Sequence, residues 1–213
     1  MNAPRFRMPH LNEEQVMHAM SIDDAYHIER VLAEGCAGVT ECVTIEGVGP
    51  FVRKRIPSKL ANRGVWAALA ECSNPRLPQM AATYEMPDQF IAVYDFVPGD
   101  TLAHIMASCG RLEAGDAVQM VREVAEAVSD LHAHGIVHCD LAPSNIILAA
   151  DGAHLIDFGI AQLTGRGMTA DSVPLGTWGF AAPEQYGFAP VDVRTDVFSL
   201  ARILGYVLCG IMP

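Results

Sequence analysis

The run HCDLAPSNIIL, which begins at His138, constrains this chain more than any other segment. Asp140 and Asn145 lie five residues apart within it, and Asp157 follows after a hydrophobic stretch that is broken at Asp151-Gly152. An Asp-Gly pair between two apolar runs is a hairpin signal. The sequence therefore predicts a loop carrying Asp140 and Asn145, then a hairpin, and then Asp157.

These three side chains suit the transfer of a phosphoryl group. The γ-phosphoryl group of ATP spreads its charge over oxygens, so its site needs Mg²⁺ held by oxygen ligands and a group that positions the incoming hydroxyl. Asn145 and Asp157 offer oxygens for the metal, and Asp140 suits the hydroxyl. We therefore expect ATP and Mg²⁺ as the cofactors, with Asn145 and Asp157 as the metal ligands.

Further segments occur in an order that resembles the eukaryotic-like protein kinases, particularly their bacterial Ser/Thr branch. Lys54 follows a strand-like run, the HCDLAPSN and DFG segments come next, GTWGFAAPE ends at Glu184, and Asp196 lies in RTDVFSLA. The resemblance covers nearly the whole chain from about Tyr26 onward. It implies an α+β, two-lobed fold with a small antiparallel β N-lobe and a mainly helical, incomplete C-lobe.

The resemblance also implies a domain organisation. Residues 1–25 are expected to form an N-terminal extension, residues 26–97 the N-lobe and residues 98–213 the C-lobe. Because the family has several more helices after the one with Asp196, we expect a truncated piece whose apolar helix Val197–Met212 is uncovered. Self-association would follow from the uncovered apolar area, and Glu184 would lack its usual arginine partner and be exposed or unpaired.

Local patterns predict individual elements. Strands are expected at 26–33, 39–46, 51–56 and 90–96, and a weak helix at 58–72 that contains Gly64. Apolar residues at helical spacing predict a second helix behind Asp116, with Gln119 as its capping partner. Residues 11–21 have a helix-compatible composition.

The resemblance assigns roles to particular residues. The catalytic set is Asp140, which orients the substrate hydroxyl, with Lys54, Asn145 and Thr177, whose hydroxyl is expected to contact the aspartate. The residues expected to bind ATP are Ala33, Gly35, Gly38, Val52, Lys54, Asp95, Val97 and Ile147. The two glycines also fit an ordinary strand turn. Lys54 also fits a solvated basic strand, although alternation turns its arginine neighbours to the other face.

Three positions depart from the family pattern. Val65 occupies the place of the helical glutamate that pairs with the lysine, and Glu71 falls on another face of the predicted helix. Cys139 replaces the arginine that reads activation-loop phosphate, and Ala142 replaces a phosphate-neutralising lysine. Loss of one such charge costs roughly 10² to 10³ in rate in other enzymes.

Two alternatives to a Ser/Thr protein kinase stay open: a pseudokinase that binds nucleotide or acts as a scaffold, and an aminoglycoside-type small-molecule kinase. The GTWGFAAPE segment argues against the small-molecule kinase.

Composition limits the partners. The net charge of −11 argues against a nucleic-acid partner, whose affinity depends on clustered basic residues. The six cysteines form no CxxC pair and no secretory signal precedes them, so we expect a cytoplasmic protein that acts on a protein Ser/Thr substrate. The apolar segment Val197–Pro213 is 17 residues long and carries Arg202, which favours a buried helix over a membrane span.

The histidines and cysteines suggest no other chemistry. The eight histidines show no HExxH or similar spacing, which argues against a zinc site. His138 is expected to be a core residue that stacks with Phe158 and Leu69. Redox sensing by Cys36 or Cys139 is a weaker hypothesis, because a reactive thiol needs a positive environment.

Overall fold

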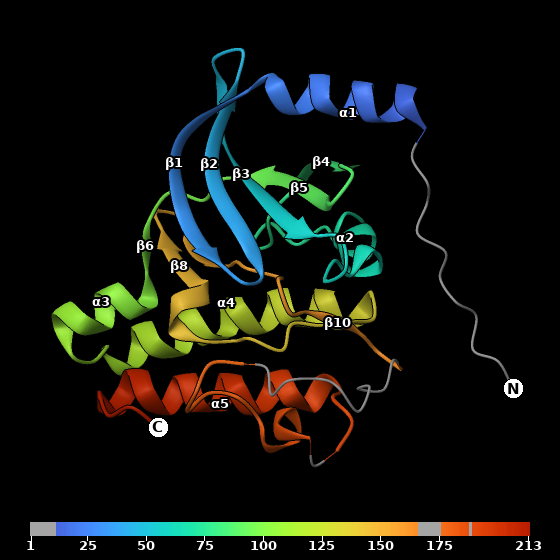
Figure 1. Ribbon diagram of the computed structural model, residues 1–213. Coiled ribbons are helices and arrows are strands. Elements are labelled where there is room, and N and C mark those ends of the chain that lie inside the picture. The colour runs from blue at the N-terminus through green and yellow to red at the C-terminus, as the bar shows by residue number, and fades with distance from the viewer. Residues whose placement is uncertain (1–11, 166–175, 188) are drawn as a thin grey trace, which may run out of the picture. The chain divides into compact units, whose positions relative to one another are not determined.

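The computed structural model describes residues 12–165, 176–187 and 189–213 (Figure 1). The chain divides into two compact units. The first contains the chain up to Ala61 together with Ala81–Tyr94, and the second contains Asn62–Met80 and Asp95–Pro213. Residues 62–80 thus belong to the second unit, although they lie inside the range 26–97 that the sequence analysis gives to the N-lobe.

The first unit is built on a five-stranded sheet in the order β1-β2-β3-β5-β4. Its elements are α1 (Glu13–Asp24), β1 (Tyr26–Gly35), β2 (Gly38–Ile45), β3 (Val48–Pro57), β4 (Met80–Glu85) and β5 (Gln89–Asp95). The β1–β2 and β2–β3 pairs are antiparallel, as predicted. Strand β4 escaped the sequence analysis. The predicted helix at 11–21 is present as α1, which begins at an Asn12–Gln15 capping box.

The middle of β3 is covered on both faces, because Val52, Arg53 and Lys54 are all buried. Arg53 is 1% exposed, and its Nε donates to Glu41 Oε2 at 2.9 Å while its Nη1 lies 3.2 Å from Asp23 Oδ1. The alternative of a solvated basic strand is therefore wrong for Lys54, and Arg53 is not solvated either. A buried guanidinium needs such partners because an unpaired buried charge is costly.

Asp23, at the end of α1, completes this network. It pairs with Arg55 Nη2 at 2.8 Å and accepts a hydrogen bond from Tyr84 Oη at 2.8 Å. The network joins α1 to strands β2, β3 and β4, which explains how an N-terminal helix is fixed to this sheet. The guanidinium of Arg53 also lies 5.5 Å from the ring centroid of Tyr26.

The second unit is mainly helical. Its helices are α2 (Arg63–Leu69), α3 (Leu102–Cys109), α4 (Ala114–Ala133) and α5 (Val193–Cys209), with short 3₁₀ turns η1 (Pro143–Asn145) and η2 (Pro183–Tyr186). Its short strands are β6 (Asp100–Thr101), β7 (Ile136–Val137), β8 (Ile146–Ala149), β9 (Gly152–Leu155) and β10 (Gln162–Leu163). Helices α4 and α5 pack side by side (Figure 1). The predicted hairpin is present, because β8 pairs with β9 across residues 150–151.

Two helix predictions need correction. The helix expected at 58–72 is shorter, because it begins after Asn62 and ends at Leu69, so Glu71 lies beyond it and is exposed. A Cβ at Gly64 would lie 2.8 Å from Leu163 Cδ1, so glycine at this position allows a close approach. Helix α4 starts earlier than predicted, at Ala114, and Asp116 lies in its first turn rather than at the cap.

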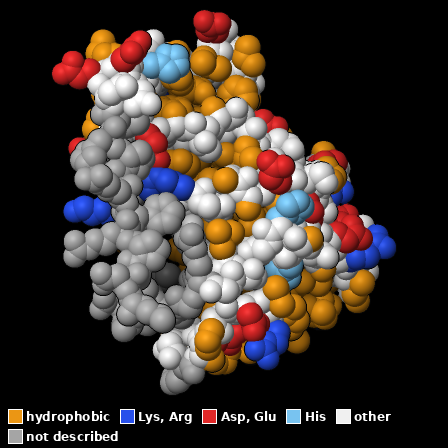
Figure 2. Space-filling view, turned by 90° about the vertical axis from the view of Figure 1, so that its right-hand side faces the viewer, with side chains coloured by type: hydrophobic (Ala, Val, Ile, Leu, Met, Phe, Trp, Pro, Cys, Tyr) orange, Lys and Arg blue, Asp and Glu red, His pale blue; other side chains and the backbone are white. Residues whose placement is uncertain are grey.

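The C-terminal helix is amphipathic, so the expectation of a buried helix holds for one of its sides only. Its buried residues are Thr195, Asp196, Ser199, Ile203 and Val207. Val197 on the opposite side is 60% exposed, and Phe198 is partly exposed. Figure 2 shows apolar side chains (orange) at the surface in its lower part, the level at which Figure 1 draws α5. Self-association through this face stays a prediction.

Among the helices of the described residues, none combines the length and the apolar character needed to cross a bilayer.

We predict that Asp23→Ala lowers the free energy of unfolding by about 3 kcal/mol, because it leaves the buried Arg53 with one carboxylate partner fewer. Urea unfolding of the purified protein measures this. The matched control is Asp24→Ala, the exposed neighbour at the end of α1, where a negative charge is unfavourable to the helix. Equal free energies of unfolding for the two variants would mean that Glu41 alone is enough to stabilise the buried Arg53.

Candidate active site

The loop between β7 and β8 holds Asp140 in a defined orientation through two neighbours. Asn145 Nδ2 donates to the backbone oxygen of Asp140 at 2.8 Å and to its Oδ2 at 2.9 Å. Because both partners can only accept, the amide nitrogen faces Asp140, and the Asn145 Oδ1 atom remains as an oxygen donor for a cation. Ser144 Oγ lies 3.4 Å from that oxygen.

The second neighbour comes from a distant part of the sequence. The backbone N–H and the hydroxyl of Thr177 both donate to Asp140 Oδ1, at 2.9 and 2.7 Å. The expected contact between this hydroxyl and the aspartate is present. Each carboxylate oxygen of Asp140 therefore has its own donor, and within the described part of the chain these donors are uncharged groups.

A backbone hydrogen bond places Asp157 close to Asn145 and Asp140. The N–H of Ile156 donates to the backbone oxygen of Asn145 at 2.9 Å, which ties the two predicted metal-binding positions together. Asp157 has a positive φ of 63°, and its Oδ1 accepts from Gly159 N at 2.9 Å. Such a conformation is uncommon outside glycine and is often found at functional sites.

His138 is a core residue, as expected. It is 0% exposed, and its Nε2 lies 3.1 Å from the backbone oxygen of Ile156 while its Nδ1 accepts from Asp140 N at 3.2 Å. Since a carbonyl only accepts, Nε2 carries the proton and the neutral imidazole satisfies both sides. The ring packs edge-on against Phe158, with centroids 4.9 Å apart. Its predicted stacking with Leu69 stays a prediction.

Asp196 anchors the backbone of the same loop from the first turn of α5. This 1% exposed carboxylate accepts from His138 N at 2.9 Å, from Cys139 N at 3.0 Å and from His132 Nε2 at 2.8 Å. Three donors offset the cost of burying its charge. Cys139 has a positive φ of 66°, so the anchored backbone is held in an unusual conformation.

Two buried residues that the sequence analysis missed connect the segment around Thr177 to the rest of the unit. Gln185 Nε2 donates to the backbone oxygen of Cys139 at 2.5 Å, and its Oε1 accepts from Ala182 N at 2.9 Å. Ser199 Oγ donates to Phe180 O at 2.8 Å. Neither residue stands in a pattern that indicates this role, because the backbone oxygens of Cys139 and Phe180 that they bind are far away in the chain.

Glu184 also has a partner. The hydroxyl of Thr195 donates to Glu184 Oε1 at 2.6 Å, and the side chain is half-buried. The expectation that Glu184 is unpaired is therefore wrong within the described residues.

The three departures from the family pattern are all buried: Val65, Cys139 and Ala142. Burial raises the pKa of the Cys139 thiol well above its usual value, and the charge of Asp196 adds to the shift. A protonated thiol in this position argues against the redox hypothesis for Cys139. Cys36 is exposed.

The predicted nucleotide-binding residues of the first unit lie in its sheet. Gly35 and Gly38 pair across the β1–β2 turn, and Ala33 pairs with Thr40. A Cβ at Gly38, whose φ is 121°, would overlap the backbone oxygen of Arg55, so glycine here is required by strand packing. The turn interpretation therefore explains Gly38 without a ligand.

Lys54 and Val52 occupy alternate positions of β3, where both are buried. Lys54 pairs with Thr40 of β2, and Val52 pairs with Cys42. Their roles toward ATP stay predictions.

The remaining predicted residues belong to the second unit. Ile147 pairs with Thr101 in the β6–β8 ladder and is buried. Asp95 and Val97 line a cavity of about 350 Å³ together with residues that include Gln79, Asp151 and His154. This cavity lies outside the group around Asp140, so the structure brings together Asp140, Asn145 and Thr177, with Asp157 adjacent.

Comparison with known proteins agrees with this geometry. The family described as "Protein kinase domain" matches residues 26–213. The chain is 36% identical over 131 residues to the serine/threonine-protein kinase PknD of Mycobacterium tuberculosis, which covers 61% of this chain. It is 27% identical over 220 residues, or 95% of this chain, to PknH of the same species, and 36% identical over 119 residues, or 55%, to the probable kinase PkwA of Thermomonospora curvata.

The chain covers 20% of PknD, 34% of PknH and 16% of PkwA, so it corresponds to a minor part of each relative. The family match spans both units and includes the loop of Asp140, the DFG segment and the helix of Asp196. By this match and this geometry, the chain belongs to the protein kinase family.

Proposed function

We propose that this chain transfers the γ-phosphoryl group of ATP to a serine or threonine hydroxyl of a protein. The observation that carries the proposal is the fixed carboxylate of Asp140, held by Thr177 on one oxygen and by Asn145 on the other. A carboxylate held in this way can accept a hydrogen bond from an incoming hydroxyl and take its proton as the new bond forms. The names of the relatives support serine and threonine as acceptors.

Mg²⁺ is the metal that the donor set fits. Asn145 Oδ1 and the carboxylate of Asp157 are hard oxygen ligands on segments joined by the Ile156–Asn145 hydrogen bond. Bound there, the ion would neutralise charge on the ATP phosphates. The residues of this chain would orient the reacting groups, with Asp140 on the hydroxyl and Lys54 on the phosphates.

The buried residues that differ from the family pattern affect the expected rate of phosphoryl transfer, not the kind of reaction that we propose. Val65 and Ala142 are buried where the family resemblance implies one carboxylate and one positive charge. Missing preorganised charge slows a reaction without abolishing it when the positioning groups remain. We therefore expect a protein kinase that transfers phosphate slowly. The experiments below distinguish it from the pseudokinase alternative.

We expect Asp140→Asn to lower kcat for phosphoryl transfer by about 10² to 10⁴, the range that a positioned proton acceptor contributes. The assay follows radiolabelled phosphate from ATP into a protein substrate, using the full-length protein. Binding of ATP should change little, because the proposal assigns Asp140 to the acceptor hydroxyl and not to ATP or the metal ion. If the unaltered protein binds ATP and Mg²⁺ but transfers no phosphate, the pseudokinase alternative is correct.

We expect Mg²⁺ to strengthen binding of a fluorescent ATP analogue, and Asp157→Ala to weaken the effect of the metal at least about tenfold. Titrations of both proteins with and without Mg²⁺ measure this. Asp88→Ala, which removes an exposed aspartate between β4 and β5, serves as the control. Equal affinity for the analogue in the presence and absence of Mg²⁺ would contradict a metal site at Asn145 and Asp157.

Ala142→Lys is expected to raise kcat while leaving KM for ATP nearly unchanged, because the added charge acts mainly on the transition state. Ala142 is buried, so the lysine must extend its stem along apolar surface to bring its ammonium group out. Ala142→Met, of similar length and without charge, separates the effect of charge from that of bulk. A rise in both variants, or a change confined to KM, would show that the missing charge does not limit the reaction.

A further inference from the structure

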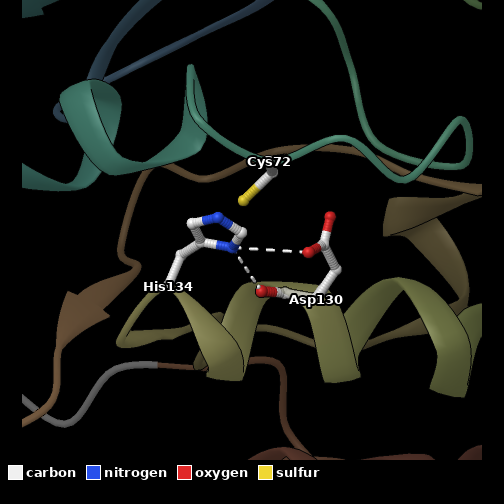
Figure 3. A group of neighbouring side chains, drawn as sticks. All are labelled: Cys72, Asp130 and His134. Carbon is white, nitrogen blue, oxygen red and sulfur yellow. Dashed lines mark hydrogen bonds and ion pairs between the residues drawn. The ribbon is translucent and has the colours of Figure 1, made fainter.

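Three side chains with metal-binding atoms meet where the segment after α2 crosses the C-terminal end of α4. They are Cys72, Asp130 and His134, and one ligand atom of each lies within 4.8 Å of the others (Figure 3). Asp130 and His134 are four residues apart, which places both on one face of the helix. Cys72 comes from a different part of the second unit, so this group has no sequence motif.

The ring of His134 is oriented as in a metal site. Its Nδ1 lies 2.8 Å from the backbone oxygen of Asp130 and 3.3 Å from Asp130 Oδ1. A carbonyl oxygen only accepts, so Nδ1 carries a proton, and Nε2 is the ring nitrogen left to bind a metal ion. Figure 3 shows this second nitrogen turned toward the sulfur of Cys72. Metal-binding histidines are commonly fixed by such a bond from the other ring nitrogen.

Asp130 holds the cysteine segment against the helix. Its Oδ2 accepts from the backbone N–H groups of Ser73 and Asn74, both at 2.9 Å. These residues directly follow Cys72, whose own N–H donates to Leu69 O at 3.1 Å. The position of the sulfur relative to His134 is therefore set by backbone hydrogen bonds.

The sulfur has no strong partner of its own among the described residues. Cys72 is buried, and its Sγ makes a contact of 3.6 Å with the backbone oxygen of Ala68. Burial, and next the charge of Asp130, raise the pKa of the thiol to about 11. A bound divalent cation would displace the thiol proton. Its two positive charges would then balance the negative charges of the thiolate and the carboxylate, while the imidazole binds as a neutral ligand.

We propose that Cys72, Asp130 and His134 bind Zn²⁺. A thiolate, an imidazole and a carboxylate together form a donor set typical of zinc, whereas Mg²⁺ and Ca²⁺ prefer oxygen alone. Bond lengths of about 2.0 to 2.3 Å require the donors to approach one another by roughly 1 Å. His134 and Asp130 are partly exposed, which leaves a water molecule access to the fourth position.

The bound ion would fasten the segment after α2 to the end of α4. None of its three ligands belongs to the group around Asp140, so the proposal does not depend on phosphoryl transfer. Its consequence is a second unit whose α2 end is held more firmly when zinc is present.

The test measures metal binding by the reduced protein without a polyhistidine tag, in excess Mg²⁺ to occupy oxygen sites. Zn²⁺ is titrated against a coloured chelator, and Co²⁺ is used to observe the thiolate-to-metal absorption band. We expect one bound ion, with affinity at least about tenfold lower in Cys72→Ser and in His134→Gln. Cys72→Ser should also lose the absorption band.

The matched control replaces the three exposed cysteines, Cys36, Cys109 and Cys209, with serine in one protein. This control should keep both the affinity and the band. Loss of binding in the control, absence of Zn²⁺ binding by the unaltered protein, or full affinity in His134→Gln would each overturn the proposal. His134 is partly exposed, so its variant decides the question even if Cys72→Ser does not fold.

Discussion

The carboxylate of Asp196 is the group on which the arrangement of the second unit depends. It is buried, it comes from the start of α5, and it accepts hydrogen bonds from the backbone of His138 and Cys139 and from the ring of His132. A buried charge is tolerated only when donors surround it. Here two of those donors are backbone N–H groups of the loop that carries Asp140. The buried carboxylate is therefore stable only when the loop has this conformation.

Around this anchor, neutral hydrogen bonds do the positioning. His138 connects the N–H of Asp140 to the backbone oxygen of Ile156, and Gln185 connects the backbone of Cys139 to that of Ala182. Hydrogen bonds between neutral groups keep their direction without adding charge to the site. The site can therefore be rigid although Cys139 stands where the family resemblance implies an arginine beside the aspartate.

The apolar departures are accommodated by packing. Val65 and Ala142 are fully buried, as is Cys139 apart from a small fraction. Each replaces a charged side chain of the family with one that fits a dry environment at no desolvation cost. The same dryness holds the Cys139 thiol in its protonated form. We infer that this chain retains the positioning part of the site and lacks part of its electrostatic stabilisation.

Much of this protein could be predicted from its sequence. The loop of Asp140, the β8–β9 hairpin, the first three strands and most of α4 follow from local signals, namely turn residues, alternation and helical spacing. The contact of Thr177 with Asp140 was expected only through the family resemblance. Turn residues, alternation and helical spacing can be recognised in a sequence because they depend on residues that are close together in the chain.

Tertiary structure decided the features whose partners are distant in the chain. The burial of Arg53 depends on Asp23 and Glu41, the role of Gln185 depends on a backbone oxygen of Cys139, and the exposed side of α5 depends on which helix covers the other. The Cys72 group is of the same kind, since its ligands come from two segments. Local sequence sets each element's conformation, but long-range packing alone decides which side chains meet, because a contact between distant residues leaves no periodic pattern in either segment.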